Sequence, residues 1–209
     1  LPNATNAVTD VGVDDALMAA RFFRNIVDWF IGNKSGLFNA DFFFPHPNVF
    51  GTTDPAIGVG LLILPFRLFT DDYLLLVNIA TLITFPLTAH ATYLLARDLT
   101  GSRLAGFVAG AVFAFCLYRF HQLDHVSILQ MQWLVYALVY LHRLRDRPTF
   151  RNGFWLAVFL VLGGLGSSSI GLYSIPVLAL AALWTLVTAT RELRTKFLRA
   201  GVLSALFAL

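Results

Sequence analysis

Long apolar runs separated by short polar connections make up most of the chain. Residues 73–96 and 170–190 are each long enough for a helix that crosses a lipid bilayer, which needs roughly 20 residues. The runs at 104–119, 126–141 and 153–166 are shorter, and we expect shorter spans there. The pattern predicts an all-helical fold, a polytopic bundle of transmembrane helices.

The first part of the chain, residues 1–54, is the least apolar. Within it Asp14, Arg21 and Asp28 recur every seven positions, and the rest of 14–31 is mostly large apolar residues and alanine. This spacing predicts an amphipathic helix that lies in the membrane interface with one polar stripe. We therefore expect residues 1–54 to form a loop on the outer face of the membrane.

The next apolar run, residues 56–69, is too short to cross a bilayer and contains Pro65 and Arg67. We expect residues 55–72 to form an interfacial helix that does not cross, and residues 73–209 to form the bundle. The sequence starts at Leu1 rather than at methionine, and it stops inside an apolar run. We accordingly expect a fragment that lacks membrane helices at both ends.

The basic residues indicate an orientation. The connections 97–103, 142–151 and 191–199 hold most of the 15 lysines and arginines, and they are every second connection. Because cytoplasmic connections are enriched in these residues, we expect these three to face the cytoplasm. The intervening connections, 119–125 and 166–171, would then face outside with the acidic N-terminal part.

Composition supports a membrane protein. The chain is 57% hydrophobic and 13% charged, whereas soluble domains carry about 25% charge. We expect a multi-pass protein of the plasma (inner) membrane, surrounded by membrane lipids. The net charge of +3 does not indicate nucleic acid, because the basic residues lie between apolar runs. The single cysteine, Cys116, excludes a disulfide within the chain.

Two adjacent carboxylates, Asp14 and Asp15, begin the predicted amphipathic helix. Aspartate is favoured at the N-cap of a helix, and acids suit its positive end. One aspartate is sufficient for capping, so the second is available for chemistry. Helix capping and a catalytic role both remain open for this pair.

A second candidate lies in residues 118–133, which include Arg119, His121, Asp124 and His125. If this stretch is helical, the two histidines share a face, and with the acid they would suit a divalent metal or a phosphate. The alternative is a polar interfacial loop with aromatic anchors.

Inside the predicted spans, Gly106 and Gly110 form a small-residue motif that is typical of close helix packing in lipid. Gln130 and Gln132 would not share one face of a helix, so we assign them no motif.

Four stretches together resemble a known family. They are "DDALMAARFFRN", "GTTDPAIGVGLLILPFRLF", "LLARDLTGSRLAGFVAGAVFAF" and "YRFHQLDHVSILQMQW". In order and content they resemble the first outer loop, the segment that leads to the next helix, the basic cytoplasmic hairpin and the second outer loop of GT-C membrane glycosyltransferases. The resemblance covers roughly residues 10–200.

The resemblance implies an enzyme that transfers a sugar from a polyprenyl-phosphate carrier at the outer face. The essential acid of the first outer loop falls on Asp14 or Asp15, as general base or acceptor-orienting group. The acid of the second outer loop corresponds to Asp124. Where some members of the family have an acid pair, this chain has His121 and His125, which leaves metal use open.

The leaving phosphate needs cations placed beforehand, and the candidates that could bind it are Arg119, His121, His125 and Arg21. If a metal takes part, its ligands would come from His121, Asp124 and His125.

Two other functions remain. One is a non-catalytic GT-C-like subunit with a structural role among other membrane subunits. The other is a transporter with broken helices at Pro86, Pro176 and 163–166, which we rank last because no charged residue lies at depth.

Overall fold

A computed structural model describes residues 13–33, 36–39, 48, 51, 54, 56–188, 190, 194–195 and 197–200, with only the backbone of 13–16. The predicted all-helical class is confirmed, since every regular element in these ranges is a helix. In chain order the elements are α1 (Val13–Phe30), α2 (Ile57–Ile63), the 3-10 helix η2 (Leu64–Leu68), α3 (Tyr73–Thr100), α4 (Arg103–Ala114), α5 (Leu117–His121), α6 (Gln132–Asp146), α7 (Phe150–Gly166) and α8 (Ser168–Thr188).

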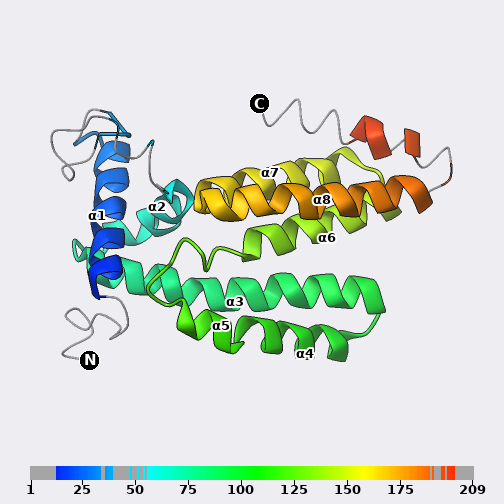
Figure 1. Ribbon diagram of the computed structural model, residues 1–209, viewed down its shortest axis with the longest axis horizontal. Coiled ribbons are helices and arrows are strands. Elements are labelled where there is room, and N and C mark those ends of the chain that lie inside the picture. Colours follow the sequence, from blue (N-terminus) through cyan, green and yellow to red (C-terminus); the bar gives the residue numbers. More distant parts are fainter. Residues whose placement is uncertain are drawn as a thin grey trace.

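The long helices run side by side in layers (Figure 1). Helix α4 packs on α3, α3 on α6, and α6 on both α7 and α8. Helix α1 stands across one end of this bundle and contacts α2 and α3, while α2 also contacts α7.

The chain turns alternate between the two ends of the bundle (Figure 1). At the end covered by α1, here called the α1 end, lie the 119–125 and 166–171 connections. At the opposite end, here called the basic end, lie the arginine-rich connections 97–103 and 142–151. The arginine-rich connections 97–103 and 142–151 thus lie at the opposite end from 119–125 and 166–171, as the charge pattern predicted. The compartment that each end faces stays a prediction.

Three segments in the described part of the chain have the length and composition to cross a membrane. They are Tyr73–Thr100, Arg103–His121 and Ser168–Thr188, and Ile57–Leu68 and Phe150–Gly166 are shorter apolar segments. Large apolar side chains face outward on α4 and α8, among them Leu104, Phe107, Leu180 and Trp184. Extended apolar surface of this kind favours a membrane protein.

Two predicted spans differ from the observed helices. The run at 104–119 is broken after Ala114, because Cys116 is extended and separates α4 from α5. The run at 126–141 is helical only from Gln132, since residues 126–131 form turns.

Helix α1 is amphipathic, as its pattern predicted. Phe23, Ile26 and Val27 are almost fully buried and pack with residues of α2 and α3 in one apolar cluster. On the polar side Arg24 lies 3.5 Å from the Asp28 carboxylate, and the hydroxyl of Tyr73 donates to that carboxylate at 3.3 Å. The buried face therefore fixes α1 on the bundle end.

The glycine motif of α4 lies directly against α3. A Cβ atom at Gly106 would lie 2.8 Å from the carbonyl oxygen of Tyr93, and one at Gly110 would lie 2.6 Å from that of Ala89. The predicted helix–helix contact is therefore confirmed, and it depends on the absence of side chains at both positions.

We expect Gly110→Val to separate α4 from α3 and to lower the free energy of unfolding by about 1–3 kcal/mol, the usual effect of overpacking. The atom that a side chain would meet belongs to backbone and cannot turn away. Denaturant titration of the protein in detergent measures the change. The matched control is Gly164→Ala, since a Cβ there meets nothing within 4 Å. Equal stability of both variants would contradict the prediction.

Candidate functional site

A pocket of about 220 Å³ opens at the α1 end between α1 and the connection from α5 to α6. Three separate parts of the chain line it. They are Met18, Ala19, Phe22 and Phe23 of α1, Asp54 and Ala56 of the first connection, and Asp124, His125, Val126 and Ser127. The walls are largely apolar, and Asp54, Asp124 and His125 are the ionisable residues among them.

The predicted acid pair lies in the helix that forms one wall of this pocket. Helix α1 begins at Val13, so Asp14 and Asp15 occupy its first turn rather than the N-cap position. Both positions suit the positive end of the helix dipole. Met18 and Ala19, one turn farther along, line the pocket. The side chains of Asp14 and Asp15 lie outside the described part of the structure.

Asp124 and His125 form a carboxylate–imidazole pair on the opposite wall. Nδ1 of His125 lies 2.8 Å from Oδ1 of Asp124. The side chain of Asp124 is 9% exposed, whereas that of His125 is 43% exposed. The contact between the carboxylate and Nδ1 fixes the orientation of the imidazole ring. The pair is therefore suited to move a proton or to face an anion.

Asp54 has a structural role that the sequence did not reveal. Its Oδ2 accepts from the hydroxyl of Ser167 at 2.9 Å, and its Oδ1 accepts from the backbone N–H of Ser168 at 3.0 Å and from its hydroxyl at 3.2 Å. The carboxylate thus caps the start of α8 from another part of the chain. Asp54 and the serines were each placed outside by the charge pattern, but no local signal paired them.

Removing this cap has a predictable cost. We expect Asp54→Ala to lower the free energy of unfolding by about 1 kcal/mol, as is typical for loss of an N-cap. Asp71→Ala at the same end is the control, because the Asp71 side chain is 83% exposed. The measurement is denaturant unfolding in detergent, and identical curves for both variants would contradict the capping role.

Arg119 does not line the pocket, although the sequence suggested it as a phosphate ligand. It is 1% exposed, and its Nη1 donates to the carbonyl oxygen of Leu129 at 3.2 Å while Nη2 donates to Oγ1 of Thr84 at 2.8 Å. Its guanidinium also lies 4.8 Å from the centre of the Phe85 ring. Arg119 therefore ties α5 and the 126–131 turns to α3.

The structure separates His121 from the other candidates. Helix α5 ends at His121, and residues 122–124 form a turn, so His121 and His125 do not share a helical face. His121 lines a different, apolar hollow with Leu117, Tyr118 and Phe120. Arg21 is exposed on α1 and is not among the residues that line the pocket.

No metal site is evident among the described residues, where no three His, Cys, Asp or Glu side chains come together as ligands. The set suggested by the sequence, namely His121, Asp124 and His125, is divided between two hollows. The described residues therefore do not assemble that ligand set.

The buried side chains of Gln130 and Gln132 form a hydrogen-bond network that the sequence did not predict. Nε2 of Gln132 donates to Oε1 of Gln130 at 2.8 Å, and Nε1 of Trp133 donates to the same oxygen at 3.2 Å. On one continuous helix the two glutamines would not share a face, but Gln130 lies in the turns before α6. Its side chain can therefore reach Gln132, and the network fixes the start of α6 beside the pocket wall.

Comparisons of the chain with protein-family models, with curated proteins and with solved structures found no significant match.

Proposed function

We propose that the chain is a membrane glycosyltransferase of the GT-C type, which moves a sugar from a polyprenyl-phosphate carrier to an acceptor at the α1 end of the bundle. The observation that carries the proposal is the pocket in which α1, the helix of Asp14 and Asp15, faces Asp54, Asp124 and His125. Acid–base groups from two of the predicted outer loops thus share one opening.

The proposed roles follow from the chemistry of the transfer. An acid of α1, Asp14 or Asp15, takes the proton of the acceptor hydroxyl or orients that hydroxyl. The Asp124–His125 pair faces the carrier phosphate, whose charge increases as the glycosidic bond breaks. The apolar wall formed by Met18 and Phe22 accommodates the lipid-proximal part of the carrier.

The orientation belongs to the same proposal. The α1 end faces the periplasm or the cell exterior, and the basic end faces the cytoplasm of a plasma (inner) membrane protein. A long prenyl chain then stays in the bilayer beside the exposed apolar side chains of α4 and α8 while its phosphate reaches the pocket.

A non-catalytic subunit in a larger membrane complex is the second candidate. It is favoured by the engagement of several polar groups in structural bonds: Asp54 caps α8, and Arg119 is bonded to Thr84 and Leu129. A protein of this kind needs its helix packing and does not need its acids.

Single asparagine substitutions distinguish the two candidates. Asp14→Asn, Asp15→Asn and Asp124→Asn are compared with the natural chain for sugar transfer from a radiolabelled polyprenyl-phosphate carrier in membranes. The enzyme proposal expects a large loss for Asp124→Asn and for at least one variant of α1. Unchanged transfer in all three variants would favour the structural role.

A further inference from the structure

The basic end contains a second pocket that the sugar-transfer proposal does not use. It has a volume of about 480 Å³ and lies where the ends of α3 and α6 meet the start of α7. Its lining is strongly charged and consists of Arg97, Asp98, His142, Arg143, Asp146, Arg147 and Asn152. This set is called the basic pocket below.

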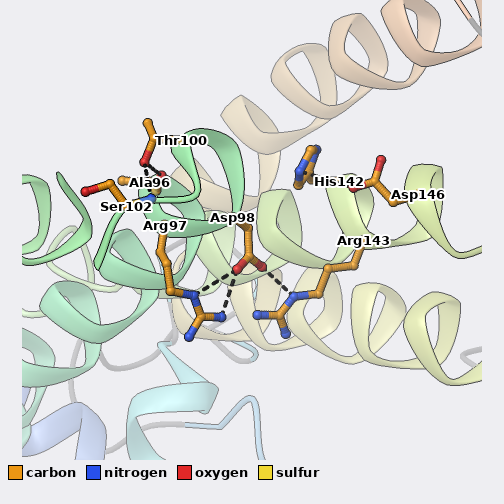
Figure 2. Close-up of polar contacts among 8 residues, drawn as sticks. All are labelled: Ala96, Arg97, Asp98, Thr100, Ser102, His142, Arg143 and Asp146. Atoms are coloured by element: carbon orange, nitrogen blue, oxygen red, sulfur yellow. Dashed lines mark hydrogen bonds and ion pairs between the residues drawn. The ribbon is translucent and has the colours of Figure 1, made fainter. Parts of the chain in front are cut away.

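One carboxylate holds two guanidinium groups side by side in the basic pocket. Oδ1 of Asp98 accepts from Nε of Arg97 at 3.1 Å and from its Nη2 at 2.8 Å, and Oδ2 accepts from Nε of Arg143 at 2.7 Å. Figure 2 shows the two guanidinium groups on either side of Asp98, with their outer nitrogens directed to the same side. Two like charges are thus fixed close together by a single acid.

Each of these two guanidinium groups also lies over a tyrosine ring. The guanidinium of Arg97 lies 5.5 Å from the ring centre of Tyr93, and that of Arg143 lies 5.2 Å from the ring centre of Tyr140. Such cation–π contacts and the shared carboxylate restrict both arginines before any ligand arrives. Little side-chain entropy then remains to be lost on binding.

Hydrogen-bond donors remain after these contacts are made. Within the described part of the chain, both Nη atoms of Arg143 have no hydrogen-bond acceptor, whereas Arg97 interacts with Tyr93 as well as with Asp98. Arg147 is exposed and adds a third guanidinium. The turn that carries it is fixed, because the amide nitrogen of Asn152 donates to the carbonyl oxygens of Arg143 and Arg147 at 3.2 and 2.9 Å.

The charges of the basic pocket favour an anion. The lining contains three arginines and two aspartates. One of the aspartates, Asp98, is already shared by two of the arginines. Asp146 is paired with His142, whose Nε2 lies 3.5 Å from Oδ2. The side chains of Arg97 and Arg143 are 35% and 29% exposed, so water screens them less than it screens open surface charges.

We infer that the basic pocket binds a phosphate group through the free Nη donors of Arg143 and the adjacent guanidinium of Arg97, with Arg147 as a third contact. Arginine forks match the oxygens of a phosphate, and the fixed pair offers several such donors to one anion. The phosphate comes from the headgroup of an anionic lipid or from a soluble phosphate. Basic pockets between helices on the cytoplasmic side are known binding places for lipid headgroups.

The test has a lipid arm and a soluble arm, both on the full chain. In the first, nanodiscs of phosphatidylcholine with or without phosphatidylglycerol are compared by native mass spectrometry and by thermal unfolding. In the second, inorganic phosphate is titrated in detergent at constant ionic strength. Retained phosphatidylglycerol supports a lipid source, and stabilisation by inorganic phosphate supports a soluble one.

Two variants and a control distinguish binding in the basic pocket from attraction to the positive charge of this end as a whole. Arg147→Ala removes one contact, and Arg143→Lys keeps the charge and loses the fork. Each is expected to weaken binding by about tenfold, the effect of losing one charge-assisted hydrogen bond. Arg151→Ala, an exposed arginine of the same end that does not line the pocket, is expected to bind normally.

The inference is overturned if neither ligand binds, or if Arg151→Ala weakens binding as much as the pocket variants do. If Arg143→Lys does not fold, Arg147→Ala decides alone, because no hydrogen bond within the described chain depends on its guanidinium. The result does not depend on sugar transfer, which is proposed for the opposite end of the bundle.

Discussion

Asp124→Asn is expected to lower the rate of sugar transfer by about 10²–10⁴-fold, the range attributed to a positioned acid–base group. Asparagine keeps the shape of the side chain, and its Oδ1 still accepts a hydrogen bond from His125, which lies 2.8 Å away in the natural chain. The amide cannot act as a general acid or base. The fold should therefore remain while the chemistry is lost.

The control for Asp124→Asn is Asp71→Asn, which removes an exposed carboxylate from the same end of the bundle. Transfer from the lipid carrier is measured in membranes, and the thermal midpoint of each purified variant shows whether it is folded. Equal transfer by Asp124→Asn and the natural chain, with both folded, would remove Asp124 from the proposed mechanism.

The largest effect on stability is expected for Phe23→Ala, at about 3–5 kcal/mol. Phe23 is 1% exposed and belongs to the cluster that fixes α1 to α2 and α3. Loss of its ring removes apolar contacts and leaves a void that neighbouring helices fill only in part. Because Phe23 also lines the pocket at the α1 end, we expect the variant to lose transfer as well.

The matched control for Phe23→Ala is Phe30→Ala, which changes a phenylalanine of the same helix that is 39% exposed. Unfolding in detergent is followed by tryptophan fluorescence, to which Trp29 of α1 contributes. We expect Phe30→Ala to stay within about 1 kcal/mol of the natural chain. Similar losses for the two variants would show that the buried face of α1 is not the one described.

Residue spacing along the sequence was sufficient to predict structure where a helix is continuous. The seven-residue spacing of Asp14, Arg21 and Asp28 predicted α1, and the structure buries its other side on the bundle. The small residues at Gly106 and Gly110 likewise predicted a close helix–helix contact, which α4 makes with α3. In both cases the information is local, because the residues that determine the contact lie on one helix.

Local sequence patterns gave wrong predictions of secondary structure and burial where the chain is not helical. Residues 122–131 have an apolar and polar composition that also suits a helix, but they form turns. The burial of Arg119 depends on Thr84, 35 positions earlier, and on a carbonyl oxygen exposed by those turns. Such partners are set by tertiary packing, which a single sequence does not specify.

The bond between Asp54 and Ser168 has a consequence for biosynthesis. The two residues are 114 positions apart, so the carboxylate has no partner until the whole chain between them has left the ribosome. Contacts of such large sequence separation form late in folding. Helices α1 to α7 can associate in order as they are made, and the Asp54 carboxylate meets Ser167 and Ser168 only when the start of α8 has been made.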